Sequence, residues 1–179
     1  RIRNESGKGS THNGLYCLQN RAVLIKEPEG ITLTDIAKAV PREVRGRVYD
    51  LYLVQQTRHW NDKPLYVYDE WIAYTNGTIT ALEYLWSGTL KEPRLGTLHN
   101  MMEFTIYSLC LLSIVQNPDQ QLKAFTTWNL DRVMSTYAQS RGEPKLYETI
   151  TEKLIEDFNT HCTRIKDKCT EHFGQEWAD

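Results

Sequence analysis

The chain has 179 residues, a mass of 20.9 kDa and a formal net charge of −2. This length favours one domain with a single core, and a composition of 40% hydrophobic and 25% charged residues argues against long disordered regions. The near-neutral charge argues against nucleic-acid binding, and the longest nearly uncharged run, residues 101–115, is too short to span a membrane.

The first part of the sequence predicts little regular structure. Residues 1–14 are polar and contain three Gly, which predicts a flexible lead-in to a single helical domain over residues 15–179. Apolar runs on either side of Gln19 and Asn20 fit a small β-hairpin or one irregular strand. The chain starts without Met and without a hydrophobic leader, which predicts a processed or trimmed product and favours an exported protein.

From residue 34 onward the spacing of apolar residues predicts helices. Breaks at Gly and Pro, with Thr97 and Asn117 as candidate caps, divide this part of the chain into segments. The predicted helices cover residues 34–40, 42–59, 64–86, 98–116, 118–140 and 145–173. Asn76 and Gly77 leave open whether residues 64–86 form one helix or two. The sequence therefore predicts a mainly α fold: a bundle of five or six helices with a small N-terminal β-hairpin or irregular segment.

The four cysteines lack the CxxC spacing of zinc sites and thiol-redox sites. Cys162 and Cys169 share one predicted helix, which separates their Cα atoms by about 10 Å and prevents a disulfide between them. Cys110 lies in the most apolar run of the chain. We therefore expect it to be a buried free thiol.

Two carboxylates lie in unusually apolar sequence. Glu70 belongs to the aromatic-rich run of residues 64–78, and Glu103 belongs to the most hydrophobic predicted helix. His99 precedes Glu103 by four residues and Tyr107 follows it by four, so these three side chains share one helix face. A buried charge without a partner is strongly destabilising, and these acids therefore need partners.

The partners can be interpreted in two ways. In the first, His99 and Glu103 pair with each other or with an Arg and hold a polar patch inside the bundle. In the second, Glu70, His99 and Glu103 converge from two helices as ligands of a divalent transition metal, Zn²⁺ or Fe²⁺, with a water in the open position. Glu70 and Glu103 would then be catalytic, and Tyr74 or Tyr107 would serve as proton donor or oxyanion partner.

The piece DEWIAY, residues 69–74, resembles the second ligand helix of gluzincin metallopeptidases. In that family a Glu within the pattern N-E-x-x-A supplies the third zinc ligand, and Glu70 and Ala73 match this piece. The first motif of the family, H-E-x-x-H, is absent, because the corresponding region REVRGRVYDLYL contains no His. The resemblance covers fewer than ten of 179 residues and does not assign the chain to the family.

No phosphate-binding loop and no nucleophile elbow occurs in the sequence. Because no catalytic motif is complete, the first hypothesis is a soluble helical domain with a non-catalytic binding or assembly role. Its partner would be another protein or a second copy of the chain. The alternative is a metal-dependent, hydrolase-like enzyme with a Glu/His/Glu site between two helices.

Overall fold

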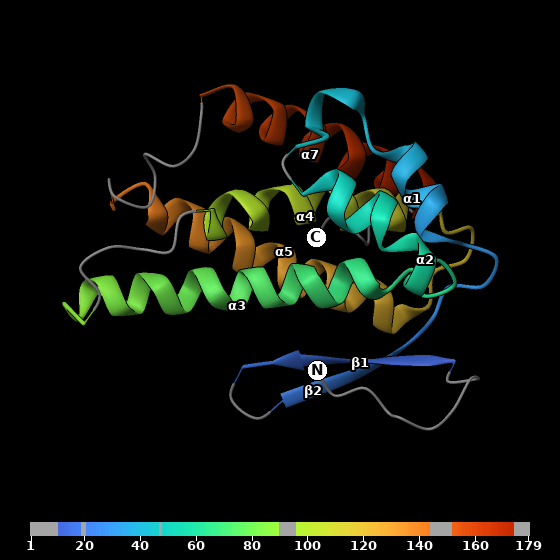
Figure 1. Cartoon of the computed structure of the whole chain (residues 1–179), viewed down its shortest axis with the longest axis horizontal. Helices are drawn as coiled ribbons and strands as arrows, with labels where there is room; N and C mark the ends of the chain where they lie inside the picture. The colour runs from blue at the N-terminus through green and yellow to red at the C-terminus, as the bar shows by residue number, and fades with distance from the viewer. Residues whose placement is uncertain (1–10, 19–20, 47, 90–95, 144–151, 174–179) are drawn as a thin grey trace.

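In the computed structural model a bundle of helices lies over a two-stranded hairpin (Figure 1). The structure describes residues 11–18, 21–46, 48–89, 96–143 and 152–173. Long helices α3, α4 and α5 run beside one another, and α7 packs against α4 on the side away from the hairpin (Figure 1). This arrangement confirms the mainly α fold with a small N-terminal hairpin. None of the described helices is long and apolar enough to cross a membrane.

The hairpin consists of antiparallel strands β1 (His12–Cys17) and β2 (Arg21–Lys26), with Leu15 opposite Val23. Side chains alternate between its two faces because successive residues of a strand point in opposite directions. Leu15 and Ile25 are buried beneath the helices, whereas Tyr16 and Leu24 are exposed on the outer face. Strand β1 begins within the polar stretch of residues 1–14, and residues 19–20 lie outside the described residues.

Five of the predicted helices are present. They are α1 (Leu33–Ala39), α3 (Tyr66–Trp86), α4 (Thr97–Ile114), α5 (Gln120–Ser140) and α7 (Glu152–Phe173). Helix α3 continues through Asn76 and Gly77, so residues 66–86 form one helix. The part of the predicted last helix before residue 152 lies outside the described residues.

The prediction of one helix over residues 42–59 is wrong. This segment forms a 3-10 turn η1 (Arg42–Val44), a π-helical segment η2 (Asp50–Gln55) and a short helix α2 (Thr57–Trp60). The cause lies in α4, because a Cβ atom at Gly46 would lie 2.0 Å from Oε1 of Glu103. The backbone N–H of Val48 donates to Glu103 at 3.3 Å, where a continuous helix would direct it to a carbonyl of the preceding turn.

Two predicted caps also differ from the structure. Residue Gly96, with φ of +93°, precedes α4, and Thr97 is already the first helical residue. A left-handed φ of this kind is adopted easily only by Gly. Asp119, rather than Asn117, caps α5 by accepting a bond of 2.6 Å from the N–H of Leu122.

Some polar side chains inside the bundle form hydrogen bonds between helices. The indole of Trp71 on α3 donates to the hydroxyl of Thr105 on α4 at 2.9 Å, and Tyr68 bonds Thr126 on α5 at 2.7 Å.

All four cysteines are buried and free, as expected for Cys110. The core therefore forms where α3, α4, α5 and α7 meet, and it positions α4 at the centre of the molecule.

Candidate functional site

The most apolar helix, α4, carries the polar group that the sequence singles out. His99 Nε2 is hydrogen-bonded to Oε1 of Glu103, and the Tyr107 hydroxyl donates to Oε2 at 2.9 Å. The N–H of Val48, between η1 and η2, also donates to Oε2. We refer to these residues, with Gly46, as the Glu103 cluster. The structure brings His99, Glu103 and Tyr107 together as their spacing of four residues predicts.

Glu103 is 2% exposed, yet its environment favours the ionised carboxylate. Burial alone would raise its pKa, but the hydrogen bond and charge of His99, with the bonds from Tyr107 and Val48, hold the pKa below its ordinary value. For Tyr107, burial and the neighbouring Glu103 carboxylate both raise the pKa, so the hydroxyl keeps its proton and acts as a donor. The side chain of His99 is 24% exposed and forms the only part of this trio that reaches solvent.

The backbone closes tightly over the other side of the carboxylate. Gly46 has no side chain, and this allows the chain to approach Glu103 closely enough for Val48 to donate its N–H. Tyr49 follows, with its ring edge-on to Tyr107 at a centroid distance of 6.3 Å and its hydroxyl donating to the carbonyl of Ala37 at 2.8 Å. The cluster therefore joins α4 to the irregular segment between α1 and η2.

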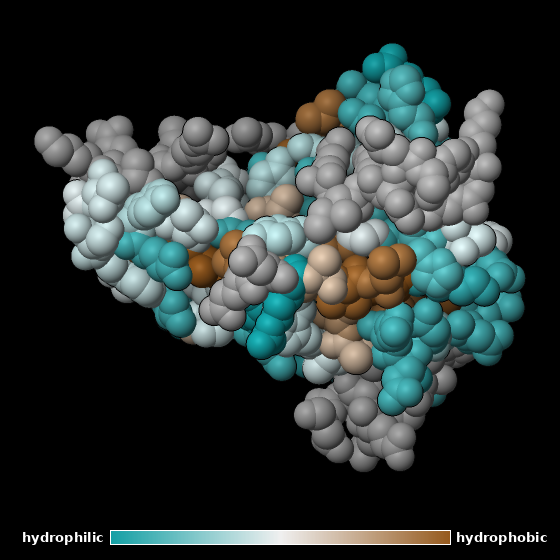
Figure 2. All heavy atoms as spheres, turned by 90° about the horizontal axis from the view of Figure 1, so that it is seen from below, coloured by the Kyte–Doolittle hydropathy of each residue, from teal (hydrophilic) through white to brown (hydrophobic). Residues whose placement is uncertain are grey.

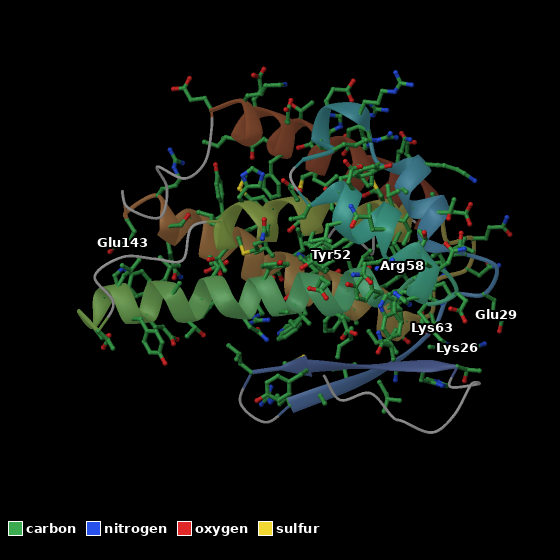
Figure 3. The ribbon with its side chains drawn as sticks, in the orientation of Figure 1. Lys26, Glu29, Tyr52, Arg58, Lys63 and Glu143 are labelled. Carbon is green, nitrogen blue, oxygen red and sulfur yellow. The ribbon has the colours of Figure 1, made fainter. Side chains whose placement is uncertain are left out.

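The two other candidate residues, Glu70 and Tyr74, lie on α3 and face the π-helical segment. The hydroxyl groups of Tyr52 on η2 and Tyr74 on α3 are 2.9 Å apart, and Tyr52 is labelled near the middle of the bundle in Figure 3. Burial, the Tyr74 hydroxyl and the charge of Glu70 raise the pKa of Tyr52, in that order of size. The ring of Phe104 stacks on Tyr74 at 5.3 Å, so the tyrosine pair forms part of the α3–α4 interface.

Metal binding by Glu70, His99 and Glu103 requires all three side chains to surround one ion at about 2.0–2.2 Å. Within the described parts of the chain, no group of three or more His, Cys, Asp or Glu side chains could hold a metal ion. The structure thus pairs His99 with Glu103 but does not assemble a ligand set that includes Glu70. The chemistry available to the cluster is that of a carboxylate–imidazole pair with one solvent-accessible partner.

A further titratable group, Glu27, has no distinguishing sequence pattern, because it stands between Lys26 and Pro28 as an ordinary turn residue would. Its Oε2 accepts a bond of 3.0 Å from the N–H of Leu65, just before α3. Burial raises its pKa to about 7, against the opposing effect of this bond. The side chain lines a cavity of about 450 Å³ between residues 26–31 and residues 114–119. Lys26 and Glu29 mark its position in Figure 3.

Similarity to known proteins adds nothing to this description. Comparison with protein-family models, with curated proteins and with solved structures finds no match for the chain.

Proposed function

We propose that the protein has a non-catalytic role in binding or assembly with another protein, and that the Glu103 cluster is a structural polar group. The observation that supports this proposal is the environment of Glu103. Both of its oxygens accept hydrogen bonds from the protein, and the residue is almost completely buried. A carboxylate with these donors stabilises the packing of its neighbours and offers little surface to a substrate.

The surface supports the binding part of the proposal. Several large apolar side chains are at least 40% exposed, and they include Leu24 on the hairpin, Val54 on η2 and Trp86 at the end of α3. The side of the molecule that carries the hairpin shows a concentration of hydrophobic side chains between hydrophilic ones (Figure 2). A concentration of hydrophobic side chains on one face, as in Figure 2, is typical of surfaces that bind other proteins.

The metal-dependent alternative would need the ligand set that the described residues lack. Metal analysis of the purified protein beside the Glu103→Gln variant tests the two proposals against each other. We expect neither protein to contain stoichiometric metal. Stoichiometric zinc or iron in the original chain that disappears in the variant would overturn the non-catalytic proposal.

Chemical denaturation of the same pair tests the structural role of the cluster. Replacing the carboxylate with an amide removes the charge that pairs with His99, and we expect a loss of about 1–3 kcal/mol in the free energy of unfolding. Glu70→Gln is the matched control, because Glu70 is a partly buried acid on the neighbouring helix. Equal stability of Glu103→Gln and the original chain would contradict the structural role.

A further inference from the structure

The backbone register of the hairpin shows which of its groups point away from the ladder. The N–H of Glu27 donates to the carbonyl of Thr11 at 2.8 Å, so these directly opposed residues form a hydrogen-bonded pair. In an antiparallel ladder such pairs alternate with pairs whose N–H and C=O groups point outward. With Leu24 opposite Gly14, the outward groups of β2 are those of Ala22, Leu24 and Lys26.

The two edges of the hairpin have different surroundings. On β1, the outward carbonyl of Tyr16 accepts a bond of 3.4 Å from the side chain of Asn76 on α3, whereas β2 is contacted by α5. On β2, the outward backbone groups of Ala22 and Leu24 have no partner among the described residues. The side chain of Leu24 is 59% exposed beside them. An unpaired strand edge with an exposed apolar side chain is a template for another strand.

Charge determines what kind of strand fits this edge. Strand β2 reads RAVLIK, with Arg21 and Lys26 at its two ends, and neither strand of the hairpin contains Asp or Glu. Lys26 pairs with Glu29 at 2.7 Å (Figure 3), and the charge of Asp119 also acts on it, but Lys26 and Glu29 are well exposed, and exposed ion pairs exchange partners at little cost. An incoming strand with an acidic residue at each end would therefore meet a positive charge at each end.

A second copy of the chain fits less well. If two β2 strands paired antiparallel through their outward groups, Leu24 of one copy would lie opposite Leu24 of the other, and each Lys26 would lie opposite an Ala22. Lys26 would then face no acidic residue of the other strand. The outer face of a six-residue hairpin is also far smaller than the roughly 800 Å² per partner that stable dimers bury.

We propose that the outer edge of β2 binds an extended segment of a partner protein as a third strand, and that this segment is apolar at its centre and acidic at both ends. The inference rests on the proposed binding function and specifies the chemistry of the partner. Backbone groups of Ala22 and Leu24 supply the hydrogen bonds. The side chain of Leu24 supplies apolar contact, and Arg21 and Lys26 fix the register.

Fluorescence anisotropy with two labelled peptides of six residues tests this proposal. One peptide carries Glu at both ends and alternating Val and Thr between them, and the other carries Lys at both ends. We expect the acidic peptide to bind at least about tenfold more tightly than the basic one at low salt, with the difference shrinking as salt is added. Equal affinity of the two peptides, or no binding of either, would overturn the proposal.

Two variants at one position separate backbone pairing from other contacts. Leu24→Pro removes the outward N–H without removing a bond of the β1–β2 ladder, and Pro is tolerated on edge strands in such positions. Leu24→Thr also loses the apolar side chain but keeps the N–H. We expect Leu24→Pro to bind the acidic peptide about tenfold more weakly than Leu24→Thr, and equal affinities would overturn strand addition.

If Leu24→Pro does not fold, amide NMR spectra of the original chain can still show whether the peptide binds at the β2 edge. On addition of the acidic peptide to the original chain, the amide signals of Ala22 and Leu24 should shift more than those of Val23 and Ile25. Shifts confined to other parts of the molecule would contradict binding at this edge. If the protein contains no metal and the peptide tests fail, only the proposal of strand addition to β2 is overturned. If the original chain contains metal that is lost in Glu103→Gln, the proposed non-catalytic function itself is overturned.

Discussion

The stability of the protein should depend on pH through Glu27, which joins the end of the hairpin to the start of α3. Its carboxylate is partly buried and accepts the N–H of Leu65. Burial is the largest cause of its raised pKa, and the nearby Asp69 and Asp62 add to the effect, whereas Lys63 opposes it. The substitution Glu27→Gln keeps the acceptor for Leu65 and removes the charge.

The size and sign of the effect follow from the two pKa values. A carboxyl whose pKa rises from 4.5 in the unfolded chain to about 7 in the folded chain binds more protons when folded. Stability therefore falls as pH rises between these values, and the total fall from Glu27 is roughly 3 kcal/mol. Because Gln mimics the protonated carboxyl, Glu27→Gln should be more stable than the original chain at pH 8 and similar to it at pH 4.5.

Urea unfolding at several pH values between 4.5 and 8 measures this difference directly. The quantity of interest is the free energy of unfolding of the variant minus that of the original chain, since other groups cancel in this difference. The exposed neighbour Glu29 offers a control, because Glu29→Gln removes a charge from the same turn without removing a buried acid. A difference that stays constant from pH 4.5 to pH 8 would refute the assignment of a raised pKa to Glu27.

Three further predictions follow from the packing. Gly46→Ala should lose about 1–3 kcal/mol of stability, because its Cβ would overlap Glu103. Gly142→Ala is the control and should change stability little, because its Cβ would lie 3.4 Å from its nearest neighbour. Similar losses in the free energy of urea unfolding for the two variants would contradict the close approach of Gly46 to Glu103. Burial raises the pKa of the thiols of Cys110, Cys162 and Cys169 to about 12. These thiols should therefore react with a disulfide reagent at pH 8 only after unfolding, and rapid labelling of the folded chain would contradict their burial. Tyr68→Phe should lose about 1 kcal/mol through its bond to Thr126, with the exposed Tyr84 as control, and equal melting of Tyr68→Phe and Tyr84→Phe would count against that bond.

Helix prediction worked where a long segment is mostly apolar and contains no helix breaker. The segment of residues 98–116 is of this kind, and α4 is buried along most of its length. Helix α3 continues through Gly77, because its neighbours on both sides pack against α4 and the hairpin and outweigh the weak helix propensity of Gly. The prediction failed at residues 42–59, where helical spacing competes with the attraction of Glu103 for the backbone N–H of Val48.

The candidate site could be predicted from the sequence only where its residues lie on one helix. A spacing of four residues on one helix places His99, Glu103 and Tyr107 together whatever the rest of the fold does, and the structure has this trio. Partners from other elements have no such local rule. The contribution of Val48 and the position of Glu70 beside Tyr52 depend on how α3 and η2 pack against α4.

The sequence by itself determined most of the helices and the trio on α4, and it narrowed the N-terminal segment to a hairpin or an irregular strand, because these features depend on residues that are close along the chain. The tertiary structure decided how Glu103 is satisfied, why the pKa of Glu27 is raised, and that the Tyr16 carbonyl of the hairpin meets Asn76 of α3. The physical reason is that burial and hydrogen bonding between distant segments depend on packing, and packing brings together residues whose separation in the sequence carries no information about their contact.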